Sequence, residues 1–360
     1  MTIIRTFGTY VASRFLSAVL VVFGGVLLLV ILIDYIELSR RAASVANATG
    51  GMVALTSLLR VPQITEQLLP FCALIAAMAA FIGLSRRSEL VVARAAGLSA
   101  WQFVAPAVLA ALAVGVLAST VYNPLAASMG EQAKRYEAAM FGSRGAGASG
   151  TWLRQRDDQG HSILHALTSR DQGETLSGVS VFRLDEAGGF AARIEADHAR
   201  FADGEWILSD ARIYTPAARP EYRPEYRLKT NLTSAQVKES FATPETVPFW
   251  RLPAYIEHAQ RSGLAVGGYQ MQFQTLLARP FMLAAMVFMA SAVSLRFPRS
   301  GGLSAMVLGG IVAGFLLYVI AKVTEDLGKA QLMYAVTAAW IPVAAGTLAG
   351  VLGLLFQEDG

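Results

Sequence analysis

The sequence predicts a polytopic α-helical membrane protein in which six transmembrane helices, arranged three and three, flank an inserted all-β domain. The chain has 30 basic and 26 acidic residues, and 35 of these 56 lie between Glu131 and Arg261. The remaining stretches are long and nearly free of charge. The composition agrees, because 54% hydrophobic and 16% charged residues is an apolar balance for any soluble domain.

A bilayer core requires about 20 apolar residues per spanning helix. Five charge-free stretches approach or exceed that length: Phe15–Ile33, Gln67–Ser85, Ala95–Gly130, Gly301–Ala321 and Ala330–Gln357. The sixth, Pro280–Leu295, is short unless the helix extends back through Arg279. A charge inside a span is costly and marks a candidate functional site. The alternative is a span that begins later and leaves Arg279 near the membrane edge.

These spans divide the chain into three parts. Residues 1–130 should hold an interfacial helix at 1–14, spans one to three and a short cytoplasmic helix at about 86–100. A further short helix, Met52–Leu59, is expected before Val61-Pro62. Residues 131–265 should form the β domain, and residues 266–360 the last three spans. The N-terminus does not read as a cleavable signal, because its apolar run is too long.

Basic residues of the short loops predict the orientation, since they are more numerous on the cytoplasmic side. One side has Arg5, Arg14, Arg86, Arg87, Arg94, Arg296 and Arg299, and the other has Arg40, Arg41, Arg60, Lys322 and Lys329. We therefore expect both termini in the cytoplasm. The insert then lies outside the cytoplasm, which means in the periplasm if the cell is Gram-negative.

The insert is predicted to be an antiparallel sandwich or open roll, because short alternating runs are separated by turn signals such as Asp203-Gly204. The expected strands are 151–156, 162–167, 178–184, 190–198, 205–209, 211–215 and 222–229. A helical link, Pro248–Ser262, should return the chain to the membrane.

Several kinds of chemistry find no support in the sequence. No G-x-x-x-x-G-K-[ST], nucleophile elbow or H-E-x-x-H occurs. The four histidines lie in the insert without a clustered carboxylate or cysteine partner, which disfavours a zinc site. Cys72 is expected to be a small packing residue inside the second span.

Charges at the membrane boundaries are more informative. Five basic residues are expected near one plane at the outer-leaflet headgroups: Arg40, Arg41, Lys134, Arg135 and Lys322. They are either ordinary anchors or a cationic ring for an anionic headgroup. In the loop from Arg86 to Trp101, Leu90, Val91 and Ala95 should form one apolar face. Its acid, Glu89, either pairs with Arg86 or Arg87 or contacts a partner.

Several segments together resemble the LptF/LptG permease family, the membrane subunits of the lipopolysaccharide exporter. They are RSELVVARAAG (Arg87–Gly97), LLRVPQITEQLLPFCAL (Leu58–Leu74), GEQAKRYEAAMFG (Gly130–Gly142), LKTNLT (Leu228–Thr233) and GGYQMQFQTLLARPF (Gly267–Phe281). The SELVV and KTNLT wording looks more like the LptG branch than the LptF branch. The resemblance covers essentially the whole chain.

The resemblance implies a transport subunit of an ABC exporter rather than an enzyme. Lipopolysaccharide would leave the outer leaflet of the bacterial inner membrane for a periplasmic bridge toward the outer membrane. The insert would be jellyroll-like. This chain would need no cofactor, because a partner binds ATP and Mg. The implied partners are an LptF-like permease, an LptB-like ATPase dimer, an LptC-like single-span protein and an LptA-like bridge.

The resemblance also suggests site residues. The segment expected to dock on the ATPase contains Arg87, Ser88, Glu89, Leu90 and Gly97. The basic candidates for lipopolysaccharide binding are Arg40, Arg41, Lys134, Arg135, Arg279 and Lys322. Candidate acyl-chain or gate residues are Leu28, Ile31, Leu32, Gly310, Gly314, Phe315 and Leu316. The Gly310-x-x-x-Gly314 pair permits either plain close packing or a mobile helix at a gate.

One residue departs from the expected pattern, and two other functions stay open. Asp34 stands where a basic residue would help an anionic ligand, which indicates either a different lipid A or pairing of Asp34 with a neighbouring Arg. A lipoprotein-release permease would carry its large domain after the first of four spans. A membrane-anchored periplasmic scaffold or sensor would bind a partner without transport.

Overall fold

The computed structural model describes residues 2–43, 49–141, 151–157, 160–170, 173–184, 189–202, 204–216, 219–232, 237, 244–261, 266–295 and 303–358. The chain forms two compact units. The first, here called the membrane unit, comprises Met1–Glu37, Ser57–Gly130 and Val247–Gly360. The second, the insert unit, comprises Leu38–Thr56 and Glu131–Thr246.

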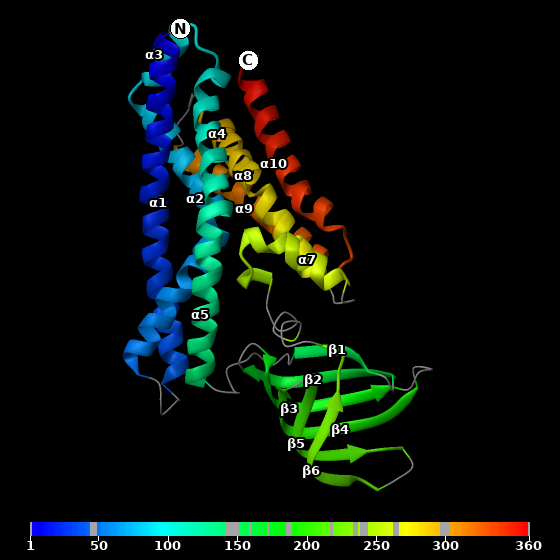
Figure 1. The fold of residues 1–360 in the computed structure, drawn as a ribbon. Helices are drawn as coiled ribbons and strands as arrows, with labels where there is room; N and C mark the ends of the chain where they lie inside the picture. Colours follow the sequence, from blue (N-terminus) through cyan, green and yellow to red (C-terminus); the bar gives the residue numbers. More distant parts are fainter. Residues whose placement is uncertain are drawn as a thin grey trace. The chain divides into compact units, whose positions relative to one another are not determined.

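Six helices in the described residues are long and apolar enough to cross a membrane, three before the strands and three after them. The first three spans are α1 (Thr2–Ala42), α2 (Gly50–Arg86), and α4 (Ala100–Leu117) continuing through the π-helix η1 (Ala118–Tyr122) into α5 (Asn123–Phe141). The last three are α8 (Gly267–Ser294), α9 (Leu303–Lys329) and α10 (Ala335–Glu358). This arrangement confirms the predicted fold class. In Figure 1, α3 and both termini lie at one end of the membrane unit.

Two helices are longer than expected. The structure has no separate interfacial helix at 1–14, because α1 is continuous from Thr2. The expected short helix Met52–Leu59 is part of α2, which passes through Pro62 and Pro70. Membrane helices tolerate such prolines when nearby groups bind the freed backbone. The carbonyls that Pro62 and Pro70 leave without a helical N–H are those of Leu58 and Glu66.

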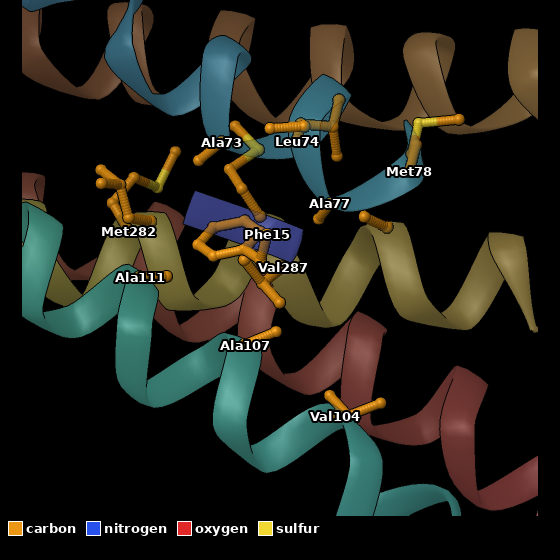
Figure 2. Close-up of a cluster of buried hydrophobic side chains, with 14 of the residues drawn as sticks. Phe15, Ala73, Leu74, Ala77, Met78, Val104, Ala107, Ala111, Met282 and Val287 are labelled. Atoms are coloured by element: carbon orange, nitrogen blue, oxygen red, sulfur yellow. The ribbon is translucent and has the colours of Figure 1, made fainter. Parts of the chain in front are cut away.

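The core of the membrane unit is built from apolar side chains of several helices, large and small. Figure 2 shows Phe15 of α1 beside Ala77 of α2, Ala107 of α4 and Val287 of α8. All four are buried. Alanines at these positions let helix backbones approach closely, which is how membrane helices gain packing contacts. Cys72 is also buried in α2, as the sequence suggested.

The insert unit contains a six-stranded antiparallel sheet with the order β1-β2-β3-β4-β5-β6. Its strands are β1 (Thr151–Asp157), β2 (Gly160–Arg170), β3 (Thr175–Leu184), β4 (Phe190–Ala202), β5 (Glu205–Tyr214) and β6 (Glu221–Lys229). This next-neighbour order corresponds to the open roll. The expected strands 205–209 and 211–215 are one strand, because Asp210 adopts a φ of 56° within β5 without ending it.

The sheet buries its own core on one face. Trp206 is fully buried and packs edge-on against Phe201 at 5.1 Å between ring centroids. Its indole Nε1 donates to Oε1 of Gln155 at 3.0 Å, so the buried polar groups of both residues are satisfied. The chain then passes through the 3₁₀ turns η4 (Pro244–Thr246) and η5 (Phe249–Arg251) into α7 (Leu252–Arg261), which confirms the predicted helical link.

Candidate functional site

A buried polar cluster lies among the helices of the membrane unit. Glu66 of α2 and Arg279 of α8 are 5% and 8% exposed and form an ion pair. Nδ2 of Asn123, at the start of α5, donates to the same Glu66 oxygen at 2.8 Å. The Asn123 side-chain oxygen accepts from the backbone N–H of Phe249 in η5 at 2.9 Å. One carboxylate therefore joins three helices and the segment that returns to the membrane.

The backbone around this cluster is irregular, and side chains satisfy it. Pro280 has no N–H, so the carbonyl of Leu276 lacks its helical partner. The hydroxyl of Ser119, in η1, donates to that carbonyl at 2.7 Å. Within the same π-helix, the carbonyl of Thr120 accepts from Nε1 of Trp250 at 3.0 Å. Single-turn π-helices frequently occur at functional sites.

Arg279 lies near the middle of α8, so the helix does extend back through it, and the depth of Arg279 in the membrane stays a prediction. Its charge is balanced by Glu66, and its side chain is buried in the bundle. These contacts favour a structural role over direct contact with a lipid. Sequence reasoning missed Glu66, which immediately precedes the charge-free stretch Gln67–Ser85. The signal that could have found it is an acidic residue between Pro62 and Pro70, because a charge inside a span, such as Arg279, calls for an opposite charge on a neighbouring span.

The short helix predicted between residues 86 and 100 is present as α3 (Glu89–Ala95), and its cytoplasmic location stays a prediction. It is shorter than the loop, and its buried residue is Ala93, whereas Ala95 is exposed. An apolar face formed by Leu90, Val91 and Ala95 stays a prediction. The side chains of Leu90 and Val91 lie outside the described residues. A turn ends α3 at Ala95, and α4 begins after a capping box between Ser99 and Gln102.

Both ends of α3 have special backbone geometry. Ser88 precedes it in the left-handed region at a φ of 59°, and Gly97 follows it at 84°. The N–H of Gly97 donates to Arg94 at 2.9 Å, and the N–H of Leu98 donates to Ala93 at 3.1 Å. This is the pattern of a Schellman cap, in which glycine is preferred because a side chain strains the left-handed conformation.

Glu89 is connected to α1. The hydroxyl of Tyr10 donates to Oε1 of Glu89 at 3.3 Å and accepts from Nε of Arg14 at 3.2 Å. Within the described residues, the Glu89 carboxylate therefore bonds Tyr10 and forms no ion pair with Arg86 or Arg87. Its carboxylate also lies in the first turn of α3, where the helix dipole favours it.

Four of the basic candidates belong to the insert unit. Arg40 and Arg41 are exposed in the last turn of α1, where positive charge complements the helix dipole. Arg135 on α5 pairs with Glu131 at 2.8 Å. Lys134 lies within the electrostatic reach of Glu245 and Glu137, besides Glu131. Lipid binding by these residues stays a prediction.

Two basic residues of the membrane unit have acidic neighbours. Lys322 lies 3.6 Å from Glu325 and 3.7 Å from Asp326 along α9, a local arrangement that suits a surface anchor. Arg60 of α2 lies 3.6 Å from the buried carboxylate of Asp34 on α1. Of the two explanations for Asp34, pairing with a neighbouring arginine is therefore the one that the structure supports.

The candidate acyl-chain residues lie mostly on outward faces. Leu28 and Leu32 of α1 are 69% and 60% exposed, Phe315 and Leu316 of α9 are 55% and 57% exposed, and Ile31 is half-buried. Gly310 and Gly314 face inward on α9. A methyl group added to Gly310 would lie 2.6 Å from Met78, and one added to Gly314 would overlap Leu74, so α9 packs closely on α2 here. This is the plain packing alternative; a gating role stays a prediction.

The comparisons with known proteins agree with this geometry. The family described as "Lipopolysaccharide export system permease LptF/LptG" matches residues 9–355. The lipopolysaccharide export system permease protein LptG of Escherichia coli K12 is 28% identical over 290 residues, 78% of each chain. The protein of the same name from Haemophilus influenzae is 24% identical over 344 residues, 93% of each chain. A match over nearly the whole chain, with three spans on each side of a β insert, means that this protein belongs to the LptF/LptG family of lipopolysaccharide export permeases.

Proposed function

We propose that this protein is the LptG-type permease of an ABC exporter, which moves lipopolysaccharide out of the outer leaflet of the inner membrane toward a periplasmic bridge. Its membership of the LptF/LptG family is the observation that carries the proposal. ATP is hydrolysed by a separate subunit, and this chain converts the movement of that subunit into movement of its helices. The six described spans with the insert after the third argue against a lipoprotein-release permease, in which the domain follows the first of four spans.

In this proposal the end of the membrane unit that carries α3 and both termini faces the cytoplasm (Figure 1). The excess of arginines in the loops of that end supports this orientation. The insert unit then lies in the periplasm. The assembly contains a second, LptF-like permease, an LptB-like ATPase dimer and an LptC-like single-span protein, and an LptA-like protein continues the bridge.

The contact between Glu89 and Tyr10 gives the coupling segment a physical connection to α1. When the ATPase moves α3, that contact and the adjoining Arg14 side chain pass the movement to α1. Helix α1 is continuous to Arg40 and Arg41, so its displacement reaches the basic pair. The backbone cap at Gly97 ends α3 and keeps it a short helix on which a partner can push.

The ligand side combines charge and apolar surface. The guanidinium fork of Arg40 or Arg41 matches a lipid A phosphate in a bidentate manner. The exposed apolar residues of α1 and α9 contact the acyl chains. The structural position of Arg279 favours leaving it out of this set.

Site-specific photo-crosslinking tests the proposal. The chain is co-expressed with its partner subunits in a Gram-negative host, with a photoreactive residue at Leu32 or Phe315. Both positions should capture lipopolysaccharide, and the capture should fall when ATP is added to membranes. Matched control positions are Leu109 of α4 and Leu348 of α10, which are 65% and 61% exposed but lie outside the proposed lining. Equal capture at all four positions, or none at Leu32 and Phe315, would contradict the proposal.

The membrane-anchored scaffold or sensor is the second candidate, and purification separates it from a transporter. A permease subunit should co-purify with an ATPase in mild detergent, at a constant ratio through size exclusion. A scaffold has no need of one.

A further inference from the structure

A groove of about 290 Å³ runs between α1 and α2, near the end of the membrane unit that carries α3. Its lining combines two kinds of surface. One part is cationic and hydroxylic, from Tyr10, Arg14, Ser17 and Arg87. The other part is apolar and lies further along both helices. This division matches the two parts of a membrane lipid.

The polar part contains two arginines, Arg14 and Arg87, and contacts with Tyr10 hold Arg14 in place. Arg14 is fixed by its Nε–H bond to the Tyr10 hydroxyl at 3.2 Å and by its position over the Tyr10 ring, 5.3 Å from the centroid. Arg14 and Arg87 are both exposed. Neither forms an ion pair within the described residues, and no acidic residue is among the described residues of the lining. The residues that line the groove therefore carry two positive charges, and the Tyr10 hydroxyl, which bonds both, separates the Arg14 guanidinium from the carboxylate of Glu89.

The apolar part owes its space to small side chains. Ala80 and Gly83 of α2 face Ala18 and Val22 of α1 across the groove. A methyl group added to Gly83 would meet nothing within 4 Å, so the glycine leaves open space rather than a close helix contact. An acyl chain can occupy such a space, because its contacts there replace those it would make with other lipid chains.

We propose that this groove binds an anionic phospholipid, with its phosphate between Arg14 and Arg87 and the start of an acyl chain along Ala80 and Gly83. The groove would take its lipid from the cytoplasmic leaflet if this end of the membrane unit faces the cytoplasm, as proposed above. The binding itself does not depend on that orientation. Guanidinium groups suit phosphate, and anionic lipids attract basic residues at the membrane surface. The bound lipid would lie beside Tyr10, whose hydroxyl contacts Glu89, and would therefore stabilise α1, α2 and the start of α3 against one another.

Native mass spectrometry tests the proposal. Phosphatidylglycerol is added to the purified complex in detergent, and the lipid that stays bound after the detergent is removed in the spectrometer is measured. The wild-type protein should retain phosphatidylglycerol more strongly than phosphatidylcholine. Arg14→Gln should weaken retention about tenfold, the effect of losing one strong phosphate contact. Gly83→Leu should weaken it as well by filling the apolar part. The matched control is Arg86→Gln, which removes a neighbouring charge at the same end of α2 that does not line the groove.

Unchanged lipid retention in Arg14→Gln and Gly83→Leu would overturn the proposal, and so would a loss of retention in Arg86→Gln as large as that in Arg14→Gln. Free glycerol 3-phosphate that competes as well as phosphatidylglycerol would also overturn it. The fourth contrary outcome is that the groove variants lose the co-purifying ATPase while they retain the lipid. The last would mean that the groove receives a protein segment. Arg87 is a weaker probe, because it also belongs to the segment expected to dock on the ATPase. The assay contains no lipopolysaccharide and no ATP. A negative result would therefore contradict the lipid site without contradicting the export function, and evidence against export would not contradict the lipid site.

Discussion

Arg279 in the middle of α8 and Glu66 of α2 form an ion pair in which both side chains are almost completely buried. Asn123 donates to the same carboxylate and also binds the backbone of η5. The pair therefore does two things at once. It leaves neither buried charge uncompensated, and it joins α2 to α8 and, through Asn123, to η5.

Removing one partner of this pair should be strongly destabilising. Glu66→Leu or Arg279→Leu leaves one uncompensated buried charge, at a cost of about 3–5 kcal/mol. The double variant Glu66→Leu/Arg279→Leu should be closer to the wild type, because it leaves no unpaired charge. Reversible unfolding of the purified chain in mixed detergent micelles measures all three.

The exposed pair of Glu225 and Arg227, 3.0 Å apart on β6, supplies the control. Exposed ion pairs contribute about 0–1 kcal/mol. Arg227→Leu should therefore leave unfolding nearly unchanged. If the double variant of the buried pair proved as unstable as the sum of its single variants, Glu66 and Arg279 would not be acting on one another.

Gly97→Ala should weaken the association with the ATPase. At a φ of 84° a methyl side chain strains the backbone by about 1–2 kcal/mol, which disfavours the cap at the end of α3. The matched control is Gly204→Ala, which has a φ of 77° and, like Gly97, open space around the missing Cβ, but lies in the insert. Quantitative co-purification should fall for Gly97→Ala alone. A similar loss in both variants would indicate general destabilisation.

Charge reversal at Glu89 should uncouple α3 from α1. Glu89→Lys places an ammonium group beside the Tyr10 hydroxyl and near Arg14, so that contact is lost and like charges repel. We expect weaker docking of the ATPase with the spans still folded. Glu89→Gln keeps an acceptor for Tyr10 and should be milder. Normal co-purification and normal transport by Glu89→Lys would mean that Glu89 has no coupling role.

Replacing Arg40 and Arg41 together by Glu should reduce lipopolysaccharide capture in the crosslinking assay more than ATPase assembly. Both side chains are exposed in the last turn of α1, where the loss of the helix-dipole interaction costs about 0.3–1 kcal/mol per charge, a small effect for a 41-residue helix. The control exchanges two arginines for Glu elsewhere on the insert unit, at Arg223 and Arg227 of β6, which are exposed. Equal loss of capture and assembly would point to misfolding of the Arg40 and Arg41 variant.

The sequence was sufficient for the architecture because apolar length and charge density are local properties. Each span needs a long apolar run, and each strand of the insert shows its own alternation, so both can be read without knowing their neighbours. Errors arose where packing changes a local tendency. Met52–Leu59 was separated from the second span because of Pro62, although α2 continues through it. Strand β5 was divided at Asp210, which the sheet accommodates.

By itself, then, the sequence determined the class of this protein, the place of its insert and the presence of a short helix between spans two and three. The tertiary structure alone decided which charges meet. Glu66 and Arg279 are far apart in the chain, as are Asp34 and Arg60, or Tyr10 and Glu89. Which of them become partners depends on the register between helices, and that register is set by side-chain packing across the bundle, which no single segment contains.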